Sequence, residues 1–245
     1  MTVRLRADRL LVERGFFESR AKAQAAIEAG LVTANGVPVR KASDQIAADA
    51  TVHADHAYPY VSRGGMKLAA ALDHFQFDPR GRVCLDVGSS TGGFTQVLLE
   101  RGAKAIYAVD VGRGQLHASL RDNPQIVSLE ETDIRTLAPE RLSETPDLAT
   151  IDVSFISLKL VLPPVLALLK PSADLVALIK PQFEAGRAAS KKGIVRDTAI
   201  QQSVCADVAA LTTSLGLRVL GVIASPIPGG DGNTEFLLGA ERRRP

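Results

Sequence analysis

From residue 64 onward, apolar strand-like segments alternate with helical segments, and this alternation most constrains the fold. The strand-like segments lie at residues 83–87, 105–110, 125–129, 148–153, 174–180, 218–225 and 235–240. The helical segments lie at residues 64–75, 93–102, 115–121, 156–169 and 198–215. Such alternation is typical of a mostly parallel sheet covered on both faces. We predict a Rossmann-like α/β domain with a seven-stranded sheet over residues 64–245, binding ligands beyond the carboxyl ends of its strands.

The first part of the chain has a different pattern. Two short helices are expected within residues 4–30, the first from residue 4 to a stop at Gly15, the second beginning after Ser19 and closing at Gly30, because these residue types suit the two ends of a helix. Two short apolar segments then flank residues 35–36 (Asn-Gly), the strongest short signal for a β-hairpin. The sequence therefore predicts a small α+β domain over residues 1–59, followed by a linker at residues 60–63.

The net charge is unevenly distributed. The whole chain has 29 Lys+Arg against 27 Asp+Glu, a net charge of +2, which taken alone argues against a nucleic-acid binder. Residues 1–22, however, carry six basic and three acidic residues, whereas residues 64–245 carry 20 of each. The total is thus an average over a basic N-terminal segment and a balanced larger domain.

Several protein classes are excluded by simple features. The two cysteines, Cys84 and Cys205, lie far apart and form neither a CxxC motif nor a Cys/His cluster, which fits a reducing compartment and not a zinc site. The longest apolar run, residues 160–169, has about half the length needed to span a bilayer. Residues 1–9 are charged and no uncharged apolar segment follows, so we expect no secretory signal. Together, these features predict a cytoplasmic protein with no membrane segment and no metal.

A glycine-rich turn, DVGSSTGGF at residues 86–94, follows the first predicted strand of the sheet. Such a turn lets the backbone approach a ligand and presents helix N–H groups to it. The glycines at 88, 92 and 93 do not match the dinucleotide pattern G-x-G-x-x-G, and Asp86 would repel a pyrophosphate. An acid followed by a looser glycine series is instead what S-adenosylmethionine (SAM) methyltransferases use, with the acid suited to the cofactor ammonium group.

Two more acidic residues end successive strands of the predicted sheet. Asp110 is placed for a ribose diol, and Asp133 for the adenine. Each acid also has an ordinary structural interpretation, as a helix cap or a strand-end carboxylate. Three acids in this order after a glycine-rich turn favour SAM over NAD. The expected SAM contacts are Asp86, Gly88, Ser89, Ser90, Thr91, Gly92, Gly93, Asp110 and Asp133.

Four ionisable residues lie near the ends of predicted elements: Lys67, Asp152, Lys180 and Glu235. Lysine is rarely buried unless it is paired, and burial lowers the pKa of an amine. Alternating lysines and acids can keep one amine basic while the others orient a substrate, as deprotonation of a ribose hydroxyl for attack on a methyl group requires. From spacing alone, two ordinary ion pairs, Lys67–Asp152 and Lys180–Glu235, explain the same residues equally well.

Longer blocks of sequence resemble the TlyA family of hemolysin A-like proteins and ribosomal RNA 2′-O-methyltransferases. Residues 4–55 resemble its S-four-type (alpha-L) RNA-binding domain. The blocks that resemble the rest of the family are YVSRGGMKL (60–68), DVGSSTGGF (86–94), YAVDVGRGQL (107–116), DVSFISLK (152–159), LIKPQFEAGR (178–187), GIVRD (193–197) and GNTEFLL (232–238). The resemblance covers nearly the whole chain.

The resemblance implies an FtsJ/RrmJ-like methyltransferase domain that uses SAM. The Lys-Asp-Lys-Glu set of that class carries over to Lys67, Asp152, Lys180 and Glu235, with Lys180 as the general base. The implied partner is ribosomal RNA or a ribosomal subunit. The implied product is a 2′-O-methylated cytidine in large-subunit (23S) rRNA and, in some members, also in small-subunit (16S) rRNA.

The basic N-terminal module is expected to contact RNA through Arg4, Arg6, Arg20 and Lys22. The chain departs from the family pattern at Ser89, where alanine is usual, and at Arg113, where an aromatic residue is common. The Arg113 departure bears on the fine contacts to the cofactor.

Two other functions are alternatives. One is a non-enzymatic RNA-binding or ribosome-assembly factor with a relic cofactor fold, against which the complete set of motif residues argues. The other is a membrane-active hemolysin, against which the lack of a signal, a spanning segment and a basic amphipathic face argues.

Overall fold

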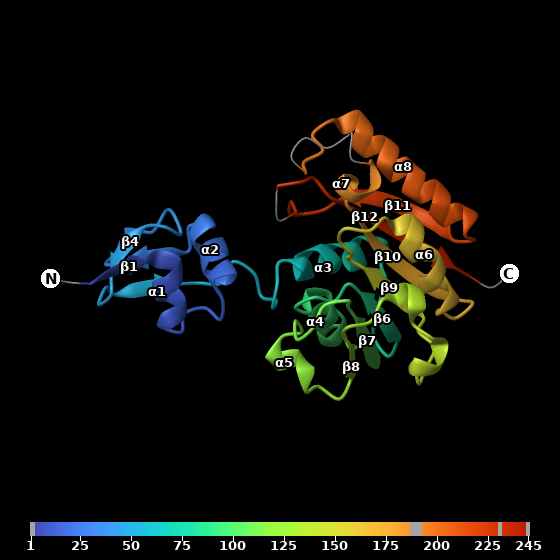
Figure 1. The fold of residues 1–245 in the computed structure, drawn as a ribbon, viewed down its shortest axis with the longest axis horizontal. Coiled ribbons are helices and arrows are strands. Elements are labelled where there is room, and N and C mark those ends of the chain that lie inside the picture. The colour runs from blue at the N-terminus through green and yellow to red at the C-terminus, as the bar shows by residue number, and fades with distance from the viewer. Residues whose placement is uncertain (1–2, 187–192, 230–231, 244–245) are drawn as a thin grey trace. The chain divides into compact units, whose positions relative to one another are not determined.

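The computed structural model describes residues 3–186, 193–229 and 232–243. These residues divide into two compact units, residues 1–59 and 60–245, which are described separately (Figure 1). Residues 60–63, expected as a linker, belong to the second unit, because Tyr60 and Val61 pack against its apolar core. Residue 187, the last of the block LIKPQFEAGR, lies outside the described residues.

The N-terminal unit is a small α+β structure. Its elements are β1 (Arg4–Arg6), α1 (Ala7–Glu13), α2 (Arg20–Glu28), β2 (Val32–Ala34), β3 (Val37–Pro38), β4 (Gln45–Ala47) and β5 (Val52–Ala54). Strands β1 and β4 pair antiparallel, and β3, β2 and β5 form a second antiparallel sheet. Buried apolar side chains from both helices and from the strands share one core.

Local signals fixed most of this unit. The Ser19 hydroxyl accepts a hydrogen bond from Lys22 N at 3.3 Å and so caps α2 as expected. Asn35 and Gly36 both have positive φ, 51° and 75°, as the tight hairpin turn between β2 and β3 requires. Strand β1 differs from the helix expected there, because its three residues pair with β4 about forty positions later, which no local pattern reveals.

The second unit contains a sheet with helices on both faces. Its strands are β6 (Val83–Val87), β7 (Ala105–Val109), β8 (Ile126–Leu129), β9 (Leu148–Ile151), β10 (Ala173–Ile179), β11 (Arg218–Ala224) and β12 (Phe236–Arg242). Its helices are α3 (Gly64–Phe75), α4 (Gly93–Glu100), α5 (Ala118–Arg121), α6 (Leu158–Ala167), α7 (Pro181–Glu184) and α8 (Thr198–Ser214), with short 3-10 turns at Ile134–Thr136 and Pro139–Arg141.

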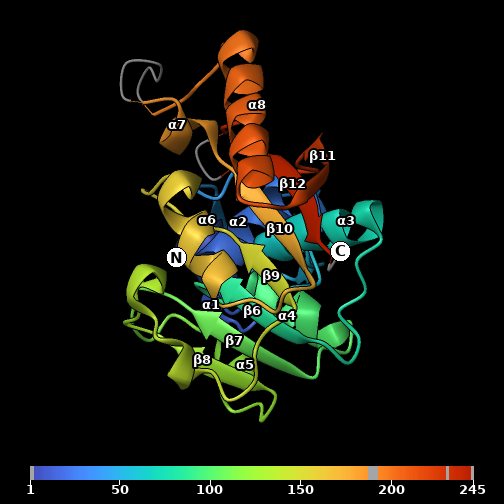
Figure 2. The ribbon, with the colours of Figure 1, turned by 90° about the vertical axis from the view of Figure 1, so that its right-hand side faces the viewer.

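The seven strands follow the order β11-β12-β10-β9-β6-β7-β8, and β12 alone of these runs antiparallel to its two neighbours. Core residues of α6 and α8 lie on one face of the sheet, and those of α3 and α4 on the other (Figure 2). All five residues of β6 are buried, which is the pattern of a central parallel strand. The predicted mostly parallel, Rossmann-like sheet is therefore confirmed.

The sequence does not predict the short helix α7, which lies near the site. It spans only Pro181–Glu184, with proline at its first position, where the missing N–H has no intrahelical partner to lose. Because four residues carry no helical periodicity, the segment could not be told from a loop. This short helix directly follows Lys180 and so helps to build the site.

Candidate active site

Two adjoining cavities open beyond the carboxyl ends of the central strands. The larger has a volume of about 770 Å³, and the smaller about 220 Å³. Gly88, Ser90 and Asp152 line both of them. Because ligands of parallel α/β sheets bind at this edge, the pair of cavities is the candidate active site.

The glycine-rich turn separates the two cavities and is shaped by close backbone contacts. Gly88 has φ 83°, and a Cβ at this position would lie 2.3 Å from the carbonyl oxygen of Asp152, so only glycine fits. A Cβ at Gly93 would lie 2.2 Å from Ser62 Oγ. The turn thus packs against both the end of β9 and the start of α3. Ser89, Thr91 and Gly93, three of the residues predicted to contact the cofactor, join the wall of the smaller cavity.

Asp110 stands at the wall of the larger cavity, just after β7. Its carboxylate accepts hydrogen bonds from Ser90 N at 2.8 Å and from Gly112 N at 2.7 Å. These bonds fix the carboxylate beside the glycine-rich turn without covering it, since the residue stays half-buried. The position suits an acceptor for a ligand diol.

The loop after Asp110 is held by a second carboxylate. Glu130 accepts hydrogen bonds from three consecutive backbone amides, those of Gly114, Gln115 and Leu116, at 2.8, 2.6 and 3.1 Å. These bonds lower the pKa of Glu130, and the bond from Leu116 N has the largest effect. Gln115 lines the larger cavity, so Glu130 shapes its wall from behind. Sequence reasoning missed Glu130, because a carboxylate after a strand has no distinguishing spacing.

Asp133 also lines the larger cavity, but it is clamped by a neighbour. Arg135 Nη2 lies 2.5 Å from Asp133 Oδ2, and Arg135 N donates to Oδ1 at 2.9 Å. The side-chain hydrogen bond from Arg135 lowers the pKa of Asp133. Arg135, which also lines the cavity, was not singled out from the sequence.

Asp86 lies behind the cavities rather than in them. Its side chain is fully buried, and the described residues that line the two cavities do not include it. The hydroxyls of Thr95 and Thr150 donate to its carboxylate at 2.6 and 3.0 Å. Burial raises the pKa of Asp86 to about 7. Asp86 therefore ties β6 to α4 and β9.

Gly92 is likewise outside the cavity walls that the described residues form. It begins α4 with φ 95°, and a Cβ there would lie 2.5 Å from Leu120. The side chains of Leu116 and Leu120 thus leave no room for a side chain at this position.

The four expected catalytic residues form two ion pairs. Lys67 Nζ lies 2.5 Å from Glu235 Oε2, and Lys180 Nζ lies 2.7 Å from Asp152 Oδ1. This differs from the ordinary pairs Lys67–Asp152 and Lys180–Glu235 named above. Lys67 and Asp152, one from each pair, both line the smaller cavity, whereas Lys180 and Glu235 lie behind them and are not among the described residues that line either cavity.

The different pairing has a structural cause. Ile179 and Phe236 are paired residues of β10 and β12, so Lys180 and Glu235 follow as adjacent positions across the two strands. Lys180 still has an extended backbone (φ −113°, ψ 99°), but its side chain contacts the loop after β9 and donates to Ser154 Oγ at 2.9 Å. The Glu235 carboxylate instead pairs with Lys67 on α3. Strand register alone does not show these side-chain directions.

The loop after β9 adds two features that sequence reasoning missed. Ser154 contacts Lys180, as described. Phe155 has φ 63°, a rare conformation for a bulky residue, and its side chain is 92% exposed. Its ring centroid lies 5.1 Å from that of Phe183 on α7. The loop thus projects an aromatic ring at the rim of the larger cavity.

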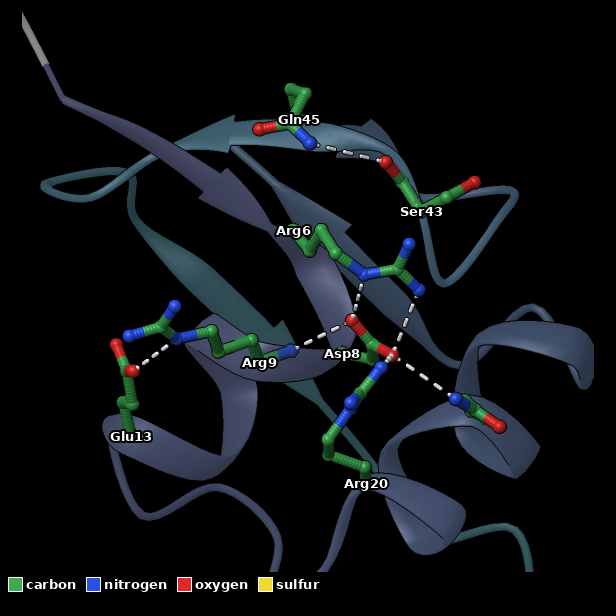
Figure 3. Close-up of polar contacts among 8 residues, drawn as sticks. Arg6, Asp8, Arg9, Glu13, Arg20, Ser43 and Gln45 are labelled. Atoms are coloured by element: carbon green, nitrogen blue, oxygen red, sulfur yellow. Dashed lines mark hydrogen bonds and ion pairs between the residues drawn. The ribbon is translucent and has the colours of Figure 1, made fainter.

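The expected RNA-binding residues of the N-terminal unit all have partners within that unit. Arg6 and Arg20 both bind Asp8 (Figure 3). Asp8 is fully buried and also accepts a hydrogen bond from Gln24 at 3.0 Å. Arg4 donates to the Gln45 carbonyl at 2.6 Å. Lys22 lies 2.7 Å from Glu18.

The Asp8 cluster uses only part of each arginine. The bonds to Asp8 involve Nε and Nη2 of both guanidinium groups, whose side chains stay 44% and 57% exposed. The hydrogen bond from Arg6 is the largest cause that lowers the pKa of Asp8 far below its usual range. Two cations are therefore held side by side at the surface by one buried anion.

Neither a membrane segment nor a metal site is found in the part of the chain that the structure describes. Within residues 3–186, 193–229 and 232–243, every helix is too short or too polar to cross a membrane. The same residues hold no cluster of three His, Cys, Asp or Glu side chains able to bind a metal ion.

Comparison with known proteins gives matches over both units. The family model for the FtsJ-like methyltransferases matches residues 60–242, and that for the S4 domain matches residues 5–52. YqxC of Bacillus subtilis (strain 168) is 47% identical over 95% of this chain and 84% of its own length. The 16S/23S rRNA (cytidine-2′-O)-methyltransferase TlyA of Mycobacterium tuberculosis is 44% identical over 97% of this chain and 90% of its own.

A solved structure gives the same result at the level of the fold. A Streptococcus thermophilus protein that carries the name hemolysin superposes with a TM-score of 0.79, at 41% identity, over 99% of this chain and 90% of its own. The resemblance read from the sequence blocks is thereby confirmed.

Proposed function

This chain belongs to the FtsJ-like methyltransferase family, and from that membership we propose that it methylates a cytidine 2′-hydroxyl in rRNA. The M. tuberculosis relative is named for both 16S and 23S rRNA. We propose 23S rRNA as a substrate here, with 16S rRNA as a possible second one, and the cytoplasm, where ribosomes are, as the place of action.

The residues around the larger cavity fit SAM by their chemistry. The half-buried Asp110 carboxylate would hold the ribose diol, and the turn Gly88–Gly93 would hold the methionine end. Asp133 would lie at the adenine end. When bound, SAM supplies an electrophilic methyl group. Asp86 supports this site from behind, through Thr95 and Thr150.

The two ion pairs would act on the ribose. Lys180 would take the proton from the 2′-hydroxyl, with Asp152 and Ser154 orienting its amine. Lys67, held by Glu235, would orient the ribose from the other side of the smaller cavity. Because methyl transfer needs an in-line approach, correct positioning would contribute much of the rate.

The N-terminal unit would dock RNA. Arg6 and Arg20, held side by side by Asp8, present positive charge toward solvent, as phosphate binding requires. Arg4 and Lys22 would extend this surface. Structured RNA is recognised largely by shape and backbone contacts, for which a small basic module is sufficient.

One observation carries the proposal: Lys67 and Asp152 line the same cavity as the glycine-rich turn. Each of them is paired with another of the four proposed catalytic residues, Lys67 with Glu235 and Asp152 with Lys180. The test is transfer of labelled methyl from SAM to separated ribosomal subunits, followed by mapping of 2′-O-methyl positions. We expect the wild-type protein to label the large subunit at a cytidine, and Lys180→Ala to label nothing while still binding SAM in calorimetry.

Lys104→Ala is the matched control. Lys104 forms an exposed ion pair with Glu144, and such pairs contribute little. This variant should label subunits at the wild-type rate. Undiminished transfer by Lys180→Ala would disprove the assignment of the base. A wild-type protein that binds RNA but not SAM would instead support a non-enzymatic assembly factor.

A further inference from the structure

Two segments that carry the proposed catalytic residues run beside each other and are joined at both ends. The first is the loop 152–157 after β9, and the second is residues 180–184, which comprise Lys180 and α7. At one end Lys180 contacts Asp152 and Ser154. In the middle Phe183 contacts Phe155. The other end is closed by Glu184.

Glu184 closes that end with two hydrogen bonds. Ser157 Oγ donates to its Oε2 at 2.5 Å, and Leu158 N donates to its Oε1 at 2.8 Å. Leu158 is the first residue of α6, so the carboxylate lies at the N-terminus of this ten-residue helix, where a negative charge is favourable. Charged acceptors make the stronger class of hydrogen bond, and both oxygens are used.

Ser157 links Glu184 to the helix a second time. Its hydroxyl accepts from Lys159 N at 3.1 Å while donating to Glu184. The hydroxyl therefore serves as the N-cap of α6 and as a donor to α7 at once. Removal of Glu184 would take away the acceptor for this hydroxyl and for the Leu158 amide together.

The loop between the two ends is strained and needs such support. Phe155 adopts a positive φ of 63°, which costs a bulky residue free energy and persists only when the surroundings impose it. Its side chain is 92% exposed, so burial of this ring does not hold the loop. The fixed points are the Lys180 contacts on one side and the Glu184 contacts on the other.

We propose that Glu184 is a positioning residue for methyl transfer. By fixing Ser157 and Leu158 to α7, it holds Asp152 and Ser154 at the distances from Lys180 that the reaction needs. Glu184 itself is not among the described residues that line the two cavities. It acts through the loop and not on the substrate. This inference rests on the proposed function, because it assigns a role in the same reaction.

The test is a series of full-length variants assayed for methyl transfer to ribosomal subunits. Glu184→Ala should lower kcat by about 10- to 100-fold, since small misplacements of reacting groups have effects of this size. Ser157→Ala, which removes one of the two bonds, should lower kcat less. Glu184→Gln keeps one oxygen as the acceptor for Leu158 N, and its NH2 group can donate to Ser157 Oγ in the reverse direction, so it should stay within about threefold of wild type. The Kd for SAM and the KM for subunits should change by less than about threefold throughout.

Glu140→Ala, at an exposed position of the turn Pro139–Arg141, is the control and should behave as wild type. Thermal unfolding of every variant shows whether a loss of kcat reflects loss of fold. If Glu184→Ala does not fold, the comparison of Ser157→Ala with Glu184→Gln decides, because only the former should lose kcat.

Equal kcat values for all folded variants, or equal losses in Glu184→Gln and Glu184→Ala, would overturn the positioning role. A fall in SAM affinity as large as the fall in kcat would do so too. Absence of methyl transfer by the wild-type protein would instead disprove the proposed function, so the two failures are distinguishable.

Discussion

Lys67 Nζ lies 2.5 Å from Glu235 Oε2, although the two residues are separated by 168 positions and both are buried. The pair joins α3 to the start of β12. Moving two charges out of water costs free energy that their attraction only partly returns, and breaking such a pair leaves one charge buried alone. A buried ion pair is therefore expected to serve function or orientation more than stability.

The first prediction concerns this pair. Glu235→Ala and Lys67→Ala should each lower the free energy of unfolding by about 3 kcal/mol, because each leaves an uncompensated buried charge. The double variant Lys67→Met/Glu235→Leu should recover most of that loss while remaining unable to transfer methyl groups. Urea denaturation measures the stability, and the subunit assay measures the activity. A double variant less stable than both single variants would contradict this account.

The second prediction concerns Asp8, whose pKa is lowered by hydrogen bonds from Arg6 and Arg20. An acid with a lowered pKa in the folded state stabilises the fold above its unfolded pKa, roughly 3.9, and this contribution is lost as the pH falls further. Asp8→Asn should therefore destabilise the N-terminal unit by about 2 kcal/mol at neutral pH. The difference from wild type should shrink below roughly pH 4.

Hydrogen exchange of the α1 and α2 amides in the full-length protein measures this effect, because it reports the N-terminal unit separately. Asp49→Asn, at an exposed position of the same unit, is the control for loss of a carboxylate. An equal difference between wild type and Asp8→Asn at every pH would show that the carboxylate charge is not what holds the two arginines.

The same cluster changes how RNA binding should be tested. Replacing Arg6 or Arg20 by alanine removes a proposed phosphate contact and a partner of the buried Asp8 together. Weaker RNA binding by such variants thus has two explanations. Lys22 is the cleaner test, because its partner Glu18 is 57% exposed and stays hydrated when the lysine is removed, although the Lys22 side chain itself is only 13% exposed.

The sequence predicted the sheet well because apolar periodicity is a local property. Helix Gly64–Phe75 and strand Val83–Val87 have the predicted ends, and no end of the other sheet strands differs from its predicted position by more than two residues. The signals that failed were non-local or short. Strand Arg4–Arg6 depends on pairing with Gln45–Ala47, and α7 is too short for a helical period.

The composition of the site could be predicted, but its connections could not. The motifs predicted that Lys67 and Asp152 belong to one site, and both line the smaller cavity. Which lysine forms an ion pair with which acid depends on the direction that each side chain takes, and the motifs do not show this direction. Asp86 shows the same limit. Successive side chains of a strand point to opposite faces of the sheet. The Asp86 side chain, which the sequence suggests as a ligand contact, points from β6 toward Thr95 on α4 and Thr150 on β9.

The third prediction concerns Glu130, which holds the loop from Gly114 to Leu116 by three backbone hydrogen bonds. Glu130→Ala should raise the Kd for SAM about tenfold, because the loop with Gln115 forms part of the cavity wall and would lose its fixed shape. Glu130→Gln, which retains a neutral acceptor, should have a smaller effect. Calorimetry with SAM measures both. Unchanged affinity in Glu130→Ala would mean that the loop keeps its shape without the carboxylate.

The last prediction follows from the buried carboxyl of Asp86. Burial raises its pKa to about 7, whereas an exposed aspartate has a pKa of roughly 3.9. Between these values the folded protein binds a proton that the unfolded chain has released, so stability must fall as the pH rises from about 4 to about 7. Asp86→Asn cannot ionise and lacks this loss. As the pH rises from about 4 to about 7, the free energy of unfolding of Asp86→Asn should therefore increase relative to that of the wild type.

Urea denaturation at several pH values between about 4 and 8 measures that gain. Asp122→Asn, which removes an exposed carboxylate, should show no such trend. A constant difference between Asp86→Asn and wild type would mean that Asp86 is already ionised in the fold, held as an anion by Thr95 and Thr150. In that case the hydrogen bonds from these two hydroxyls, at 2.6 and 3.0 Å, would be strong enough to offset the cost of burying the charge.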